Sequence, residues 1–110
     1  MDFSEYQTAA IATAKYHDLK IPGIVYCALK CAGEAGEVAE KIGKVYRDKD
    51  GHFDPDTEYE IAKELGDVLW YLANIAEELG MELDWCAEVN IKKLADREKR
   101  GVIKGSGDNR

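Results

Sequence analysis

Two short acidic motifs contain the residues of this sequence that are best suited to chemistry. Glu34 and Glu37 lie three positions apart, and so do Glu64 and Asp67. In a helix this spacing places two side chains about 60° apart, so both project from one face. Each pair also borders a row of apolar residues at helical spacing. If the two helices pack antiparallel through these rows, all four carboxylates are expected to converge at the edge of the core.

Four converging carboxylates carry an electrostatic cost that a bound cation would remove. Two carboxylates about 5 Å apart repel by roughly 3 kcal/mol at an effective dielectric constant near 20. Only Lys30, Lys41 and Lys63 lie close enough in sequence to neutralise them. An all-oxygen donor set favours a hard ion, so we predict Mg²⁺, with Mn²⁺ possible. A ferritin-type di-iron centre is disfavoured because the chain has no Glu-x-x-His motif.

The alternative is that these acids are ordinary residues of a solvated helix face, since the chain has 22 acidic residues. Nearby glycines favour a site. Gly33, Gly36 and Gly66 lie inside predicted helices, where each costs about 0.5–1 kcal/mol relative to alanine. Their position beside the acids suggests close helix approach or room for a ligand, although packing of small residues alone would also explain them.

Helical periodicity predicts the elements that position these motifs. We expect four helices, over about residues 3–19, about residues 24–47, the segment after Pro55 that ends at Gly80, and the segment from Asp84 to about Arg100. Asp56 or Thr57 is the expected cap of the third helix, and Asp84 that of the fourth.

No alternating strand pattern competes with these helices, so the predicted fold class is all-α and bundle-like. A chain of 110 residues has room for one compact domain, which we place at residues 1–110. Residues 101–110 are expected to form a flexible, glycine-rich tail.

The second and third predicted helices are apolar on two sides. In the third, Ile61, Leu65 and Leu72 share one face, whereas Trp70 and Ala73 lie on the opposite side, where Trp70 would be a core or interface residue. A helix that is apolar on two sides in so small a chain is expected to pack against a second subunit. We therefore predict a homo-oligomer, either a dimer or a tetramer.

Composition excludes several classes of partner. With 15 basic and 22 acidic residues the net charge is −7, which argues against a nucleic acid polymer or an anionic membrane as partner. No apolar run approaches the roughly 18 residues of a membrane span, and the first residues lack the pattern of a signal peptide. Three cysteines without a Cys-x-x-Cys spacing suit a reducing compartment. We expect a cytoplasmic protein.

The two acidic motifs, in this order, resemble the MazG-like branch of the all-α nucleoside triphosphate pyrophosphohydrolases. The family pattern is Glu-Glu-x-x-Glu on one helix and Glu-x-x-Asp on the next, and Glu34, Glu37, Glu64 and Asp67 match it. The flanking stretches 32–40 and 65–74 are also similar, and the resemblance spans about residues 3–107. One position departs, because Gly33 stands where the family has its first glutamate. Glu40 or Glu60 could take over its role.

The resemblance implies hydrolysis of a nucleoside triphosphate between its α and β phosphates, giving a monophosphate and pyrophosphate. It implies that the four matching acids are catalytic and bind Mg²⁺. Asn90 and Lys93 match a family Asn-x-x-Lys and share a helix face with Arg97, so this trio is expected to bind substrate phosphates. Tyr71 lies one turn beyond Asp67 and is expected to contact the nucleotide.

Two other functions fit the same residues. One is pyrophosphate release from another nucleotide, such as a phosphoribosyl-ATP type of substrate, by an enzyme of the same fold. The other is a non-catalytic helical module that associates through its second apolar faces and leaves its acids in water.

Overall fold

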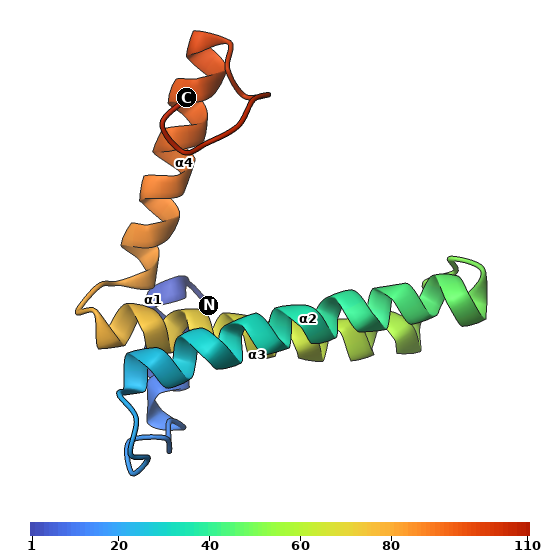
Figure 1. The fold of residues 1–110 in the computed structure, drawn as a ribbon, viewed down its shortest axis with the longest axis horizontal. Coiled ribbons are helices and arrows are strands. Elements are labelled where there is room, and N and C mark those ends of the chain that lie inside the picture. Colours follow the sequence, from blue (N-terminus) through green and yellow to red (C-terminus); the bar gives the residue numbers. More distant parts are fainter.

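A computed structural model describes residues 1–110 and consists of helices without strands. The four helices are α1 (Phe3–Ala12), α2 (Gly23–Lys49), α3 (Pro55–Glu78) and α4 (Leu83–Arg100) (Figure 1). The all-α class and the number of helices predicted from the sequence are therefore confirmed. No helix combines the length and the hydropathy that a membrane span requires.

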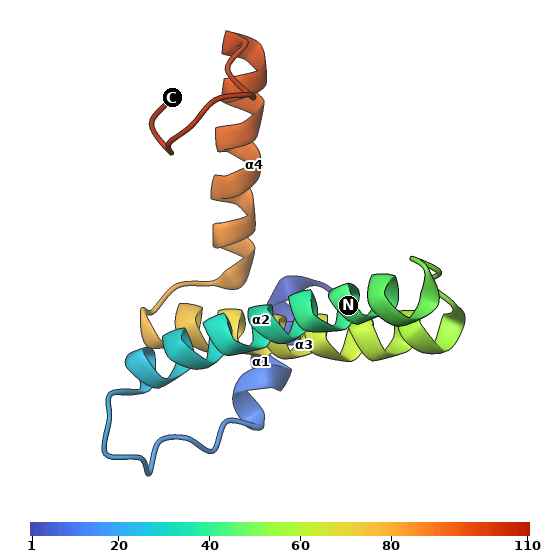
Figure 2. The ribbon, with the colours of Figure 1, turned by 45° about the vertical axis from the view of Figure 1, so that its right-hand side comes forward.

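The two long helices α2 and α3 pack against each other along their length as an antiparallel pair, which we call the arm (Figure 1). Helix α1 packs on α3, and α4 contacts only α1 and α3. Beyond those contacts α4 rises away from the arm, as two views of the ribbon show (Figures 1 and 2). A single chain therefore does not close into a four-helix bundle.

The turn between α2 and α3 is fixed by local backbone chemistry. Asp50 and Gly51 both have positive φ, 52° and 78°, which ends α2 and reverses the chain. Asp54, and not the predicted Asp56 or Thr57, caps α3, and its side chain accepts a hydrogen bond from the Thr57 amide at 2.8 Å. This bond holds the pKa of Asp54 down at about 2. Pro55 occupies the first helical turn, where its missing amide hydrogen costs nothing.

Helix α1 ends at Ala12, well before the predicted end at Leu19. The segment that follows is drawn onto α3 by Tyr16, which is only 5% exposed. Its hydroxyl donates to Glu78 Oε1 at 2.9 Å and lies 3.4 Å from the buried Asn74 Oδ1. Contacts with residues some sixty positions away thus outweigh the local preference for helix in this segment.

The start of α4 is fixed by a side chain of α1. The predicted cap Asp84 lies inside the helix, and the cap residue Glu82 makes no side-chain bond. Instead, Gln7 Oε1 accepts a hydrogen bond from the Leu83 amide at 2.7 Å, and Gln7 Nε2 donates to the Met81 carbonyl at 3.0 Å. A distant amide side chain therefore satisfies a group that a local cap usually satisfies.

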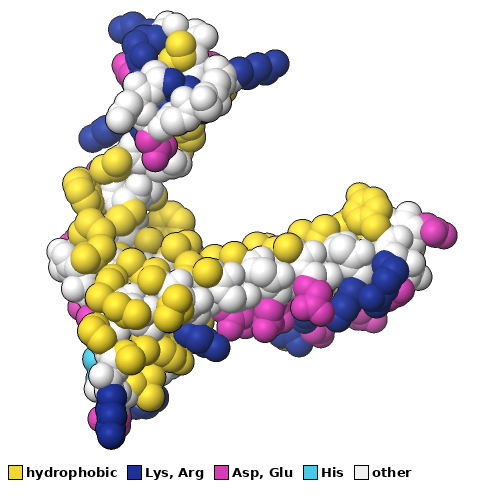
Figure 3. Space-filling model, viewed as in Figure 1, with side chains coloured by type: hydrophobic (Ala, Val, Ile, Leu, Met, Phe, Trp, Pro, Cys, Tyr) yellow, Lys and Arg dark blue, Asp and Glu magenta, His cyan; other side chains and the backbone are white.

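The chain buries few residues and leaves many large apolar side chains exposed. Only 11 of 110 residues are buried, and the core cluster consists of Ala10, Ala73 and Leu83. Leu72, 42% exposed, helps to line an apolar hollow of about 510 Å³ between α3 and the start of α4. Hydrophobic side chains gather over the corner where α4 leaves the arm, whereas acidic side chains follow the arm's lower edge (Figure 3).

After Arg100 the chain has no helix and turns back along α4 (Figure 2). Arg97 donates to the Asp108 carbonyl at 2.8 Å, and Lys93 pairs with the Asp108 carboxylate at 3.2 Å. Arg110 donates to the carbonyls of Val102, Ile103 and Gly107. Residues 101–110 are thus tied to α4 and to one another.

We predict that Tyr16→Phe lowers the free energy of unfolding by about 1–3 kcal/mol, because the buried Asn74 oxygen and Glu78 lose a hydrogen-bond donor. Urea unfolding followed by tryptophan fluorescence measures the change. Tyr59→Phe is the matched control, since Tyr59 is 66% exposed and its hydroxyl has no recorded partner. Equal stability of the two variants would contradict the role given to Tyr16.

Candidate metal and nucleotide site

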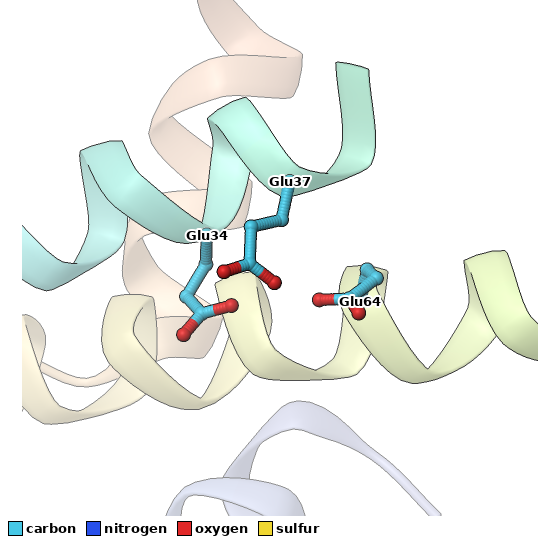
Figure 4. Close-up of side chains that lie close together, drawn as sticks. All are labelled: Glu34, Glu37 and Glu64. Carbon is cyan, nitrogen blue, oxygen red and sulfur yellow. The ribbon is translucent and has the colours of Figure 1, made fainter. Parts of the chain in front are cut away.

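Three glutamates from the two helices of the arm meet at the seam between α2 and α3. Glu34 and Glu37 extend from α2 toward α3, where Glu64 lies beside them (Figure 4). One carboxylate oxygen of each lies within 4.8 Å of the other two. The convergence expected from the antiparallel packing of the two acidic motifs is therefore present for these three residues.

Glu64 is the most enclosed of the three acids, with a side chain that is 12% exposed. Its Oε1 atom pairs with Lys41 Nζ at 3.0 Å. Its Oε2 atom is buried and has no hydrogen-bond partner. A buried polar atom without a partner costs about 1–3 kcal/mol, so this oxygen marks a position where a ligand would be stabilising.

The pKa of Glu34 reflects the repulsion among these acids. Its pKa is raised above the ordinary glutamate value, first by desolvation and then by the negative charges of Glu37, Asp67 and Glu64. Asp67 is exposed and lies outside the closest set of three, yet its charge acts on Glu34. All four acids of the two motifs therefore belong to one electrostatic cluster.

A hollow of about 370 Å³ opens beside the acids and is lined by Thr13, Glu34, Asp67, Trp70 and Tyr71. Tyr71 thus lies where the sequence predicted it, next to Asp67. Its pKa is raised, mainly by burial and then by its hydrogen bond with Tyr26. The rings of Trp70 and Tyr71 meet edge to face at 4.8 Å and form the aromatic part of the lining.

Two residues that line this hollow, Thr13 and Trp70, were not predicted from the sequence to belong to the site. Trp70 packs on the core cluster, as expected, but it does not point away from the acids. It follows Asp67 by three positions, so helical spacing itself indicates a shared face. Its Nε1 donates to Thr13 Oγ1 at 2.8 Å. Thr13 carries no sequence signal, because only the early end of α1 brings it to the hollow.

The two additional candidate acids differ in their ion-pair connections to Glu34, Glu37 and Glu64. Glu40 is exposed and pairs with Lys44 at 2.8 Å, four positions along the same helix. Glu60 is 49% exposed and pairs with Lys63 at 2.9 Å and with Lys41 at 3.3 Å. Glu60 is therefore linked to Glu64 through a shared lysine, whereas Glu40 makes no recorded contact with the cluster.

The predicted phosphate-binding residues of α4 do not meet the acids within one chain. Asn90 lines the apolar hollow between α3 and α4, whereas Lys93 and Arg97 contact the tail at Asp108. Helix α4 makes no contact with α2, which carries Glu34 and Glu37. Their role in substrate binding stays a prediction, and it requires either a second chain or a change in the position of α4.

The glycines beside the acids do not mark close helix approach within one chain. A Cβ atom added at Gly33, Gly36 or Gly66 would meet no atom within 4 Å. The explanation that these glycines allow close helix packing within one chain is therefore wrong. Open space for a ligand or for a second chain remains.

The donor set of the cluster fits a hard divalent cation. Glu34, Glu37 and Glu64 offer only carboxylate oxygens as ligand atoms, and Glu64 also has an unpartnered buried oxygen, Oε2. Oxygen atoms bound to one Mg²⁺ lie at most about 4.2 Å apart, so the separation within 4.8 Å requires only small side-chain rotations. No histidine or cysteine belongs to the cluster, which disfavours zinc.

Comparison with known proteins agrees with this description. The family model of the MazG nucleotide pyrophosphohydrolase domain matches residues 27–102, which include α3, most of α2 and all of α4. Gene 37 protein of Mycobacterium phage L5 is 44% identical over 109 residues, covering 96% of each chain. No solved structure matches the chain. With a family match over more than half of its length and the acidic motifs of that family meeting at one seam, this chain belongs to the MazG nucleotide pyrophosphohydrolase family.

Proposed function

We propose that the protein hydrolyses (deoxy)nucleoside triphosphates between the α and β phosphates in a Mg²⁺-dependent reaction. The products are a nucleoside monophosphate and pyrophosphate. The convergence of Glu34, Glu37 and Glu64 in a chain of the MazG family is the observation that carries this proposal. Asp67 completes the set through its charge on Glu34 and its place in the adjoining hollow.

The charge of the substrate explains why a cation is needed. A nucleoside triphosphate carries roughly four negative charges and would approach a chain of net charge −7 at its most acidic point. A bound Mg²⁺ supplies positive charge for the phosphate oxygens and lowers the pKa of the attacking water. Glu34, Glu37, Glu64 and Asp67 are the residues that would hold it, and Mn²⁺ would be accepted by the same oxygen donors.

The chain's own residues supply a proton acceptor and a surface for the nucleoside. A carboxylate that is not engaged by the cation can accept the proton of the attacking water, and Glu34 and Asp67 are the two acids that line the hollow. Trp70 and Tyr71 offer aromatic faces and edges on which a nucleobase can pack. The hollow therefore gives the nucleoside a place next to the acids that face its phosphates.

A second copy of the chain is part of the proposal. Exposed Leu65, Leu72 and Leu79 follow one stripe along α3 at intervals of seven residues, and the apolar hollow at the α3–α4 corner is uncovered. Covering such surfaces is the main stabilisation that a dimer or tetramer gains. A second chain is also one way to bring Asn90, Lys93 and Arg97 to a neighbouring acidic cluster. The free cysteines suit a cytoplasmic location.

A panel of nucleotides identifies the substrate. Pyrophosphate release from nucleoside triphosphates supports the proposal, and release from a phosphoribosyl-ATP type of substrate alone would replace it with the other reaction of this fold. No release from any nucleotide, with no shift in melting temperature on adding Mg²⁺ and nucleotide, would favour a non-catalytic module.

We predict that Glu64→Gln and Asp67→Asn each lower kcat by at least about 100-fold, because each removes a carboxylate that would hold and orient the cation relative to the attacking water. Pyrophosphate release at saturating Mg²⁺ measures the loss. Glu58→Gln is the control, since Glu58 is an exposed acid of the same helix α3. Full activity in both site variants would move the metal site elsewhere.

The pH dependence of stability is predicted to follow Glu34. Because its pKa is raised by folding, the folded chain binds this proton more tightly than the unfolded chain, and the stabilisation is lost as pH rises above about 4 toward neutrality. Without divalent ions, Glu34→Gln should therefore melt at a higher temperature than the wild type at pH 7, with a smaller difference near pH 4.

Mg²⁺ should reverse the order of the two melting temperatures, so that the wild type melts above Glu34→Gln. At 100 times its dissociation constant it stabilises the wild type by about 2.7 kcal/mol, and most of this gain is lost in Glu34→Gln. Thermal melts at both pH values, with and without Mg²⁺, test both effects. A variant that is less stable than the wild type at pH 7 without metal would show that Glu34 makes favourable contacts that outweigh the repulsion.

We predict that Leu72→Glu converts the oligomer to a monomer, because it places a charge in the apolar hollow that a second chain would cover. Light scattering coupled to size exclusion measures the mass. Leu19→Glu is the matched control, because Leu19 is 48% exposed on the loop between α1 and α2 and should leave the assembly intact. A wild-type chain that is already monomeric at micromolar concentration would reject the proposed assembly.

A further inference from the structure

One lysine lies between the acidic cluster and its neighbouring acid. Lys41 Nζ contacts Glu64 Oε1 at 3.0 Å and Glu60 Oε2 at 3.3 Å. It extends from α2, one helical turn after Glu37, so it crosses the same seam that brings the glutamates together. Its side chain is 32% exposed, so it is partly enclosed by the two helices.

The contact with Lys41 makes the two carboxylate oxygens of Glu64 unequal. Oε1 is held by the ammonium group, whereas Oε2 is buried and unpartnered. A carboxylate that is free to rotate exchanges its two oxygens, whereas a charged hydrogen bond to one oxygen favours the orientation that leaves the other oxygen free. Glu64 lies beside Glu34 and Glu37 at the seam, and Oε2 is its oxygen that no side chain of the protein engages.

We propose that Lys41 is a positioning residue, which fixes Glu64 so that Oε2 faces the cation held by the acidic cluster. This inference rests on the proposed metal-dependent function. Lys41 touches neither the substrate nor the cation, and acts through Glu64 alone. Residues that orient a metal ligand in this way typically change metal affinity or activity by about 10–100-fold when they are removed.

Two effects of Lys41 on a bound cation have opposite signs, which makes the proposal testable. Its charge repels a divalent cation, whereas its hydrogen bond holds a ligand of that cation in place. Glu60 contacts the same ammonium group at 3.3 Å and offsets its charge. The positioning effect therefore dominates, and removal of Lys41 weakens binding.

The experiment compares Lys41→Met with Lys41→Arg, which keeps the charge and the hydrogen-bond donors. Binding of Mn²⁺ alone is followed by electron paramagnetic resonance, and kcat and KM for pyrophosphate release are measured separately. Lys63→Met is the matched control, since Lys63 also pairs with Glu60, at 2.9 Å, but has no recorded contact with Glu64. Circular dichroism checks the helix content of each variant, and Lys41→Gln replaces the methionine variant if that variant aggregates.

The expected result is Mn²⁺ binding weakened by about ten-fold or more in Lys41→Met, with a lower kcat, substantial recovery in Lys41→Arg and wild-type behaviour in Lys63→Met. Unchanged or tighter Mn²⁺ binding in Lys41→Met overturns the proposal, and so does a folded Lys41→Arg that is no better than Lys41→Met. An equal loss in Lys63→Met also overturns it, because the effect would then be one of general charge. A wild-type chain that neither binds Mn²⁺ nor releases pyrophosphate would instead reject the proposed function itself.

Discussion

The antiparallel packing of α2 on α3 is the interaction on which the rest of this structure depends. It buries apolar side chains along the arm, and it brings like charges from two helices to one seam at the same time. Each close pair of ionised carboxylates costs on the order of a few kcal/mol at an effective dielectric constant near 20. This repulsion acts among the candidate metal ligands themselves, and it contributes to the raised pKa of Glu34.

The charges around the cluster are arranged so that part of this cost is already offset. Along the seam, Lys63, Glu60, Lys41 and Glu64 follow one another as a series of ion pairs with alternating sign. The series ends at Glu64 Oε2, which is buried without a partner. Beyond that atom Glu34, Glu37 and Asp67 have no recorded cationic partner in a salt bridge, and this is the point at which an added cation relieves repulsion most.

Helical spacing predicted that the acids of each motif share a face, and the assumed antiparallel packing of the two helices brought Glu34, Glu37 and Glu64 together. Spacing also predicted Tyr71 beside Asp67, and the same rule applied to Trp70 would have found the other aromatic residue of the hollow. The helix ends were predicted less well. Tyr16 shortens α1 by docking on Asn74 and Glu78, and Gln7 replaces a local cap at the start of α4. These contacts join residues far apart in sequence, so no local sequence pattern predicts them.

Because the chain does not close into a bundle, the candidate site and the surface proposed for assembly are adjacent on α3. Tyr71 and Leu72 are adjacent on α3, and they face the hollow beside the acids and the apolar hollow at the α4 corner respectively. A second chain that covers the apolar hollow would therefore pack within one residue of the surface proposed to receive the nucleoside. Gly33, Gly36 and Gly66, next in sequence to the same acids, also have open space beside them. In this arrangement, assembly and substrate binding share one helix, so a change in the packing of α3 would be transmitted to both.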